Sequence, residues 1–294
     1  MLVDMVIRLV KEKPLGVAGG VIVLVLILVA IFADFLTPYG MSEPHLADRL
    51  SPPSAEYVLG TDSLGRDQLS RIIYGARISL FVGLCGAFLN VLVAMTIGLS
   101  SGFFGGKLDL IVQRFVDARM CFPWTFLILT VMSLIGPGLL QATIVIGTVW
   151  GVACSRIIRS AVIAIKENMY VDAAIAVGCT PTRMLTKHIL PNIMATVVII
   201  FTMSIGQIIL VEATISFLGF GVPPPNPSWG GMISLEGRRF MLMAPWLAIW
   251  PGVALCLVVY GFNMLGDAVR DVLDPRLRGG LGRYGRAEKK TLGK

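Results

Sequence analysis

Six long apolar runs constrain the fold of this chain more than any other feature. A helix needs about 20 mostly apolar residues to cross the hydrocarbon core of a bilayer, and several of the runs approach that length. Charged residues make up only 15% of the chain, whereas a soluble domain has about 25%. We therefore predict an all-α, polytopic membrane protein with about six transmembrane helices. The runs are Val17 to Phe35, Ile78 to Ser101, about Cys121 to Ile135, Leu139 to Ile158, Ile193 to about Gly219, and Pro245 to about Gly266.

The first run has two interpretations, because Arg8, Lys11 and Lys13 precede it as basic residues precede the core of a signal peptide. We favour a membrane anchor. The run is long for a signal peptide, no convincing small-residue cleavage site follows it, and many more spans come after it.

The distribution of basic residues sets the expected orientation. With the N-terminus inside, the inner segments 1–16, 102–120, 156–188 and 268–294 hold 19 of the 25 Lys and Arg residues. By the positive-inside rule, both termini and the polar segment between spans four and five face the cytoplasm. The expected organisation is an N-terminus with the first helix (1–36), an extracytoplasmic segment (37–77), a five-helix core (78–268) with an inner loop (166–192) and an outer loop (220–244), and a basic cytoplasmic tail (269–294).

Several other classes of function have little support in the sequence. The net charge of +7 resides in basic residues that flank apolar spans, so topology explains it better than nucleic-acid binding does. The five cysteines lack CxxC or Cys/His spacing, and His45 and His188 have no further ligands nearby. We therefore expect no metal site, no disulfide framework and no catalytic residues, since a Ser/Lys dyad, paired aspartates and HExxH are also not evident.

The inner loop, Lys166 to Asn192, is a polar interruption that hydrocarbon cannot hold, because unpaired charge there costs roughly 2.5–3.5 kcal/mol per residue. Asn168 is positioned to cap a helix from Met169 to about Val177, and Gly178 can end it in a left-handed conformation. Thr180 followed by Pro181 is a strong signal for a second helix start. The loop is thus predicted to be two short helices that meet at Gly178.

Each short helix is predicted to have one apolar face of modest bulk. Helical spacing places Val171, Ala174, Ile175 and Gly178 together on the first helix, and Pro181, Met184, Leu185 and His188 together on the second. We expect this elbow to insert into a groove of a partner, with Pro191 marking the transition to the next span.

The inner loop carries a family resemblance. Its pattern Asp172-Ala173-Ala174-x3-Gly178-x9-His188-x-Leu190-Pro191 resembles the Glu-Ala-Ala loop of ABC importer permeases, with aspartate in place of glutamate and histidine in place of an aliphatic residue. The resemblance implies that the loop couples transport to an ATPase. The residues implied are Asp172, Ala173, Ala174, Gly178, Pro181, His188, Leu190 and Pro191.

Nearly the whole chain is similar to the C-type permease subunit of the oligopeptide, dipeptide and nickel importer group. Three further segments carry this likeness: Leu59 to Asp62 with Gly65 to Asp67, Ser216 to Gly219 with Pro224 to Gly230, and Asn263 to Asp267 with Leu273 to Pro275. The resemblance implies a bacterial inner-membrane protein that pairs with a related permease and two cytoplasmic ATPase subunits, and that receives substrate from an external binding protein.

The sequence also indicates that ATP binds to other subunits. The chain has no GxxxxGK[ST] phosphate loop, so we expect no ATPase activity and no cofactor in it, with ATP and Mg²⁺ bound by the partner subunits. Di- or oligopeptides are the expected substrates. Nickel chelates or another small solute, an ion-coupled secondary transporter and, less favoured, a membrane enzyme are the alternatives.

Separate predictions concern Glu212, three pairs of charged residues and several glycines. Glu212 lies roughly 29 Å along span five, near its outer end, where it could line an outer gate or hold neighbouring loops. Charge spacing predicts structural pairs at Arg114 with Asp117, Asp267 with Arg270, and Asp62 with Arg66. Small residues at four-residue spacing are candidates for close helix packing: Gly98, Gly102 and Gly106; Gly147 and Gly151; Gly16 and Gly20.

Overall fold

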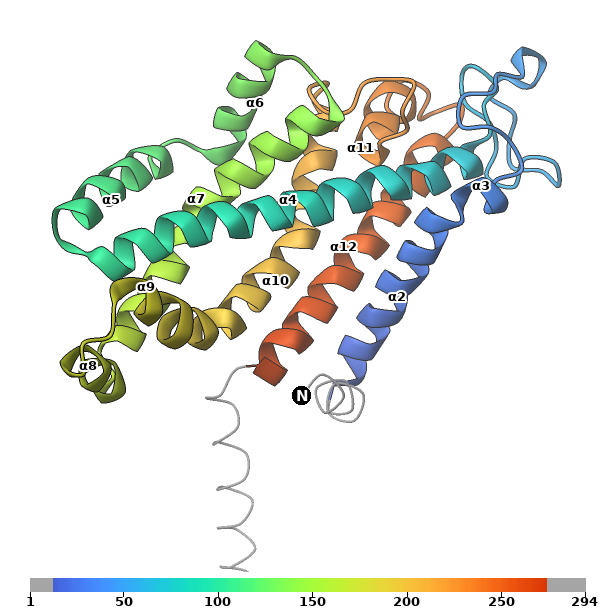
Figure 1. Cartoon of the computed structure of the whole chain (residues 1–294). Coiled ribbons are helices and arrows are strands. Elements are labelled where there is room, and N and C mark those ends of the chain that lie inside the picture. The colour runs from blue at the N-terminus through green and yellow to red at the C-terminus, as the bar shows by residue number, and fades with distance from the viewer. Residues whose placement is uncertain (1–12, 274–294) are drawn as a thin grey trace, which may run out of the picture.

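Long tilted helices form the body of the protein, and shorter elements cover its two ends (Figure 1). The computed structural model describes residues 13–273, and no strand occurs in that range. The elements are α2 (Pro14–Ile31), α3 (Ala33–Leu36), η1 (Leu46–Asp48), α4 (Gln68–Phe104), α5 (Gly106–Met120), α6 (Trp124–Ile135), α7 (Leu139–Lys166), α8 (Met169–Ala176), α9 (Pro181–Arg183), the π-helical η2 (Met184–Ile189), α10 (Leu190–Phe217), α11 (Trp229–Met232), the π-helical η3 (Ile233–Gly237) and α12 (Trp246–Leu273).

The prediction of about six spans agrees with five long helices and one bent helix pair. Five helical segments of residues 13–273 are long and apolar enough to cross a membrane, and α5 with α6 passes the same test only as a pair, bent by 88°, as a broken span or a re-entrant loop does. The tail expected over 269–294 lies beyond the described residues, apart from the last turn of α12.

The third span differs from its prediction. The helix α6 has only 12 residues, or about 18 Å at 1.5 Å per residue, which is too short for a core of about 30 Å. Residues 106–120, which the charge count assigned to an inner connection, instead form α5 and pack along α7. The Arg159 guanidinium bonds Asp109 at 2.6 Å, and Arg156 pairs with Asp117. These cross-helix pairs offset part of the charge of this segment.

The second span starts ten residues earlier than predicted. The helix α4 begins at Gln68 because the Asp67 carboxylate accepts a hydrogen bond from the Ser70 amide at 2.7 Å, which caps its first turn. The first turns of this 37-residue helix therefore belong to the segment expected outside the membrane.

Glycines let α4 and α7 approach closely, as their spacing predicted. A methyl group on Gly98 would lie 2.6 Å from the Ser155 carbonyl oxygen, and one on Gly151 would lie 2.6 Å from the Val93 Cβ atom. The prediction of close packing does not hold for every glycine in the pattern. Gly106 has nothing within 4 Å, and Gly20 meets only Leu265 at 3.8 Å.

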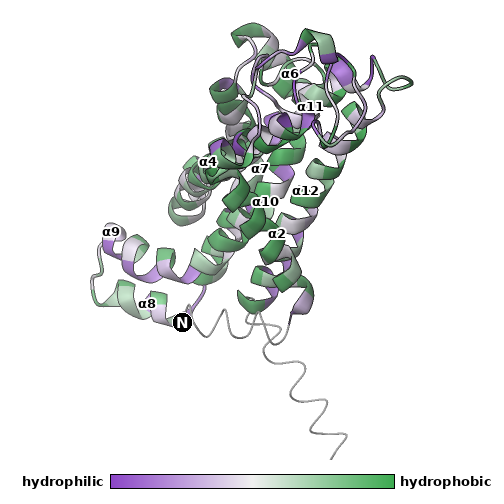
Figure 2. Cartoon of the chain, turned by 90° about the vertical axis from the view of Figure 1, so that its right-hand side faces the viewer, coloured by the Kyte–Doolittle hydropathy of each residue, from purple (hydrophilic) through white to green (hydrophobic). Residues whose placement is uncertain are grey.

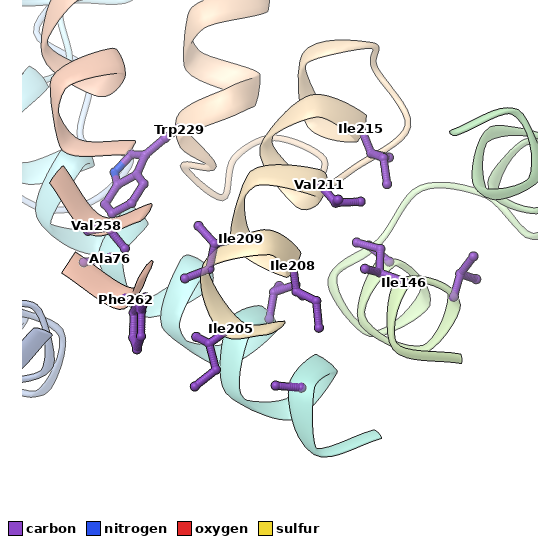
Figure 3. Close-up of a cluster of buried hydrophobic side chains, with 14 of the residues drawn as sticks. Ala76, Ile146, Ile205, Ile208, Ile209, Val211, Ile215, Trp229, Val258 and Phe262 are labelled. Carbon is purple, nitrogen blue, oxygen red and sulfur yellow. The ribbon is translucent and has the colours of Figure 1, made fainter. Parts of the chain in front are cut away.

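The main core lies around α10, which is flanked by α7 and α12 (Figure 3). Ile208 and Ile209 of α10 are fully buried, with Ile146 of α7 on one side and Phe262 of α12 on the other. A second buried cluster lies where α4, α7 and α10 meet the segment 166–192; we call this end of the bundle inner and the opposite end outer, after the sides that the basic residues predict. These clusters leave the outward faces of the long helices apolar and exposed, as a lipid environment requires.

Of the three predicted charge pairs, two form. Arg114 lies 3.6 Å from Asp117, and the Arg66 Nε atom lies 2.6 Å from the Asp62 carboxylate. The pair of Asp267 and Arg270 is wrong: within residues 13–273 the α12 ion pair is Lys13 with Asp271, at 2.5 Å. Asp267 and Arg270 are both exposed, where an ion pair contributes little, whereas Asp271 faces the start of α2.

Candidate functional site

A helical elbow made of α8, Gly178 and α9 projects from the inner end of the bundle (Figure 2). Gly178 has a φ of +82°, in the left-handed region that favours glycine. Its amide donates to the Ile175 carbonyl at 2.9 Å, and the Cys179 amide donates to the Ala174 carbonyl at 3.0 Å. This is the Schellman arrangement that ends a helix, so the predicted role of Gly178 as terminator is confirmed.

The two predicted N-cap residues stand at the starts of helices, but their side chains do not form the expected capping hydrogen bonds. Asn168 and Thr180 each precede a helix, yet neither side chain bonds the first turn. The Asn168 side-chain Nδ2 atom instead donates to carbonyls of the preceding helix, those of Ala164 at 3.1 Å and Ile165 at 2.9 Å. Asn168 therefore closes the end of α7, where the last carbonyls lack partners in the helix.

The elbow is attached to the bundle by a few apolar side chains. Val171 is buried and Ala174 half-buried against the inner cluster, which includes Met184 and Ile189. The Asn192 amide nitrogen adds a 3.3 Å hydrogen bond to the Tyr170 hydroxyl. The face that carries Val171 and Ala174, which the sequence assigned to a partner, is thus directed at the protein's own core.

The opposite surface of the elbow is the exposed one. Met169 is 86%, Val177 87% and Ile175 59% exposed, and they lie beside the exposed Asp172 and Ala173. The Asp172 carboxylate has no hydrogen-bond or ion-pair partner among the described residues. An exposed apolar surface of this kind is a candidate for contact with another protein or with the membrane.

The elbow leads into span five without a break. Residues Pro181–Phe217 form one helical run of 37 residues, and Pro191 lies in the first turn of α10, where a missing N–H costs little. Pro191 thus marks the transition to span five, as predicted, and it does so without interrupting the helical run. On the other side, the Lys166 ammonium bonds the Phe103 carbonyl at 2.7 Å, which ties the end of α7 to the end of α4.

The remaining predicted residues of the loop also lie on the elbow or at its base. Pro181 and Pro191 are exposed, while His188 and Leu190 are half-buried. The His188 ring lies 6.5 Å from the Tyr170 ring. The structure thus brings the eight residues of the pattern into one continuous unit.

Glu212 lies at the outer end of α10, as predicted, and is only 1% exposed. Its carboxylate accepts a 2.6 Å hydrogen bond from the Ser216 hydroxyl, and the Ser216 oxygen in turn accepts one from the Val222 amide at 3.1 Å. Of the two interpretations, this geometry matches the one in which Glu212 holds the following loop. No surface of this chain exposes it as a gate would require.

The sequence predicted the pair of Asp62 and Arg66, but not the larger charged cluster to which this pair belongs at the outer end. Asp62, Arg66, Arg71 and Glu236 meet beside a hollow of about 300 Å³. The signal was present, since two of the segments that carry the family resemblance supply its walls. Their approach could not be read from the sequence, because they are more than 150 residues apart.

The fold and its spans together define a polytopic membrane permease of the ABC importer kind, and the elbow lies where the sequence predicts the coupling loop. Residues 94–279 match the family described as the binding-protein-dependent transport system inner membrane component, and residues 2–53 match the N-terminal transmembrane domain of oligopeptide transport permease C. The chain belongs to this family and is a C-type permease subunit of an ABC importer.

Relatives of known description cover almost the whole chain. It is 40% identical to the dipeptide transport system permease protein DppC of Alkalihalophilus pseudofirmus, over 91% of this chain and 88% of that protein. The corresponding values are 38%, 91% and 89% for the glutathione transport system permease protein GsiD of Pectobacterium atrosepticum. They are 37%, 91% and 88% for the oligopeptide transport system permease protein OppC of Bacillus subtilis.

A solved structure has the same fold. The inward-facing MetNI methionine ABC transporter gives a TM-score of 0.56 at 16% identity, and the match covers 69% of this chain and 96% of the other. At this identity the likeness concerns the arrangement of helices alone.

Proposed function

We propose that this permease couples ATP hydrolysis by separate cytoplasmic subunits to the import of di- or oligopeptides. The observation that carries the coupling role is the exposed apolar surface of α8, with Met169, Ile175 and Val177 beside Asp172. The peptide substrate follows from relatives named for dipeptides, oligopeptides and glutathione. Nickel chelates or another small solute are the second candidates.

The assembly that fits this role has four kinds of subunit. A related permease would complete the membrane pathway, two ABC ATPase subunits would bind ATP and Mg²⁺ and contact the elbow, and an extracytoplasmic protein would deliver the substrate. The bias of 19 of 25 basic residues towards the inner segments supports cytoplasmic termini and an inner-membrane location. The permease itself contributes no ATPase site.

The geometry of the elbow suggests how force is transmitted. Because Pro181–Phe217 is a single helical run, a displacement of α9 moves the inner end of α10 directly. The inner end of α7 moves with it, since Glu167 and Asn168 are the only residues between α7 and α8. Closure of the ATPase dimer would thus tilt spans four and five and open the path alternately to either side.

Substitutions at Gly178 test the coupling role. The site has open space within 4 Å, so a side chain there meets nothing in this subunit, but a φ of +82° strains any β-branched residue by roughly 1–2 kcal/mol. In proteoliposomes with all partner subunits, we expect Gly178→Val to reduce dipeptide uptake at least about tenfold while ATP hydrolysis continues. Gly178→Asn is the matched control, because asparagine tolerates the left-handed conformation, and it should retain most uptake.

Normal uptake by Gly178→Val would contradict the coupling role of the elbow. Omitting the ATPase subunits addresses the alternative class: uptake driven by an ion gradient alone would favour a secondary transporter. Hydrolysis of the peptide by the isolated chain would favour a membrane enzyme. Competition of dipeptide uptake by nickel chelates separates the two substrate candidates.

A further inference from the structure

The outer hollow is built by segments that are remote in the sequence. Arg66 and Arg71 come from the turn before α4 and from its first turns, while Asn226, Glu236 and Arg239 come from the segment after α10. The hollow has a volume of about 300 Å³, at the lower end of the range for small-molecule sites. Its lining residues lie on and around α11 and around the start of α4, at the end of the bundle opposite the elbow (Figure 1).

Both acidic groups beside the hollow are already occupied. The Asp62 carboxylate accepts hydrogen bonds from the Leu64 amide at 2.9 Å, the Arg66 amide at 3.0 Å and the Arg66 Nε atom at 2.6 Å. The Glu236 carboxylate accepts two from Ser63, at 3.2 and 2.8 Å, and lies 3.6 Å from Arg66. Neither carboxylate has much capacity left for another cation.

Two arginines in the wall of the hollow have guanidinium groups with few hydrogen-bond or ion-pair partners. The Arg71 side chain is only 7% exposed, its Nε atom is 3.6 Å from Asp62, beyond hydrogen-bond distance, and its Nη1 atom has no hydrogen-bond partner. The Arg239 guanidinium lies 5.3 Å from the Phe240 ring and forms no ion pair with any described residue. Asp67 does not compensate for them, because one of its oxygens caps α4 and the residue does not line the hollow.

The surplus of arginine hydrogen-bond donors in the hollow favours an anionic ligand. An arginine fork pairs best with a carboxylate or phosphate, through charge-assisted hydrogen bonds. The rest of the lining is largely apolar, with Val222, Met232 and Leu235 next to the guanidinium groups. A compact anionic group attached to an apolar body fits this wall better than a free phosphate does.

We propose that the hollow binds a short peptide by its C-terminal carboxylate, held by Arg71 and Arg239, on the outer side of the permease. The proposal deepens the peptide-import function above and rests on it. Such a site would receive the peptide before it enters the path, and it would select for a free C-terminus.

Binding of a dipeptide to the purified permease assembly tests this without transport. The external binding protein is left out, so that its own pocket does not contribute. The probe is radiolabelled Ala-Phe, in equilibrium dialysis at up to about 10 mM because an affinity near 1 mM corresponds to only about 4 kcal/mol. The same peptide with a C-terminal amide serves as the competitor that lacks the carboxylate.

Adjacent arginines provide a matched pair of variants. Arg239 lines the hollow and Arg238 does not, and both are exposed, so neither substitution threatens the fold. We expect Arg239→Gln to weaken Ala-Phe binding at least tenfold and Arg238→Gln to leave it unchanged. Arg71→Gln should weaken it further, with Arg71→Lys intermediate, and the peptide amide should compete at least tenfold less well than Ala-Phe.

Equal competition by the amide, unchanged binding in Arg239→Gln or no binding of Ala-Phe would overturn the inference. If Arg71→Gln does not fold, the amide and the Arg239 variant still decide it. ATP-dependent uptake of Ala-Phe, measured separately with the binding protein present, keeps the two proposals apart. Uptake without a carboxylate-dependent site refutes this inference alone, whereas the absence of any peptide uptake refutes the proposed function.

Discussion

The substitution Gly98→Ala tests whether glycines hold α4 and α7 at their observed separation. The added methyl carbon would lie 2.6 Å from the Ser155 carbonyl oxygen, and 2.7 and 2.9 Å from two carbons of Ile158. Ordinary contacts are about 3.5–4.0 Å, so the two helices would have to separate by several tenths of an ångström at least. The carbonyl belongs to the helical backbone of α7 and cannot move alone.

The expected cost comes from overpacking, which is typically about 1–3 kcal/mol. Alanine also favours a helix over glycine by about 1 kcal/mol, and this gain would hide part of the cost. Gly252→Ala supplies the correction, because Gly252 lies inside α12 with nothing within 4 Å of the added carbon. The difference in unfolding free energy between the two variants cancels the propensity gain and should be about 1–3 kcal/mol, with Gly98→Ala the less stable.

Reversible unfolding in mixed micelles, with increasing sodium dodecyl sulfate and helicity measured by circular dichroism, gives the two free energies. We expect Gly252→Ala to be at least as stable as the unchanged protein and Gly98→Ala to be less stable. A difference below about 0.5 kcal/mol would show that α4 and α7 can separate freely, and would refute the packing argument.

Two further substitutions probe the outer end, and the same unfolding assay measures both. Ser216→Ala leaves Glu212 and the Val222 amide without their shared partner and should cost about 1–3 kcal/mol. Ser204→Ala, whose buried hydroxyl only donates to the Phe201 carbonyl, is its control, and an equal loss in the two would contradict the linking role of Ser216. Asp62→Asn removes the carboxylate shared by two buried arginines and should cost about 3–5 kcal/mol, far more than Asp34→Asn at an exposed pair. Because hydrogen bonds from Arg77 and Tyr74 lower the Asp34 pKa, the small contribution of that pair is present at neutral pH and is lost as the pH falls through the lowered pKa.

The sequence predicts the features that depend on local chemistry. The apolar runs locate the spans because each helix satisfies its own backbone in lipid. Gly178 is recognisable because the Schellman arrangement involves only six neighbouring residues, 174–179. The broken third span is not predictable in this way, since the charges of α5 are offset by Arg156 and Arg159 on another helix.

Which side of a helix is buried is harder to predict than where the helix begins and ends. Val171 and Ile175 share one stripe of α8 by spacing, yet Val171 is buried and Ile175 is 59% exposed. The difference depends on where α4 and α7 end, which no local pattern encodes. The outer hollow has the same origin, because Arg66 and Glu236 become neighbours only through the packing of the bundle.

The two ends of the molecule are built for different tasks. At the outer end the Trp229 indole of α11 donates to the Ile72 carbonyl of α4 at 3.1 Å, and the Trp246 indole of α12 donates to the Thr61 carbonyl, in the segment before α4, at 3.2 Å. The chain of Glu212, Ser216 and Val222 fastens the end of α10 to the loop that follows it.

At the inner end, a small apolar contact and two side-chain hydrogen bonds hold the elbow within residues 13–273, and much of its apolar surface is exposed. A force applied to the elbow would therefore displace the inner end of α10 most, because more hydrogen bonds hold the outer end than hold the elbow.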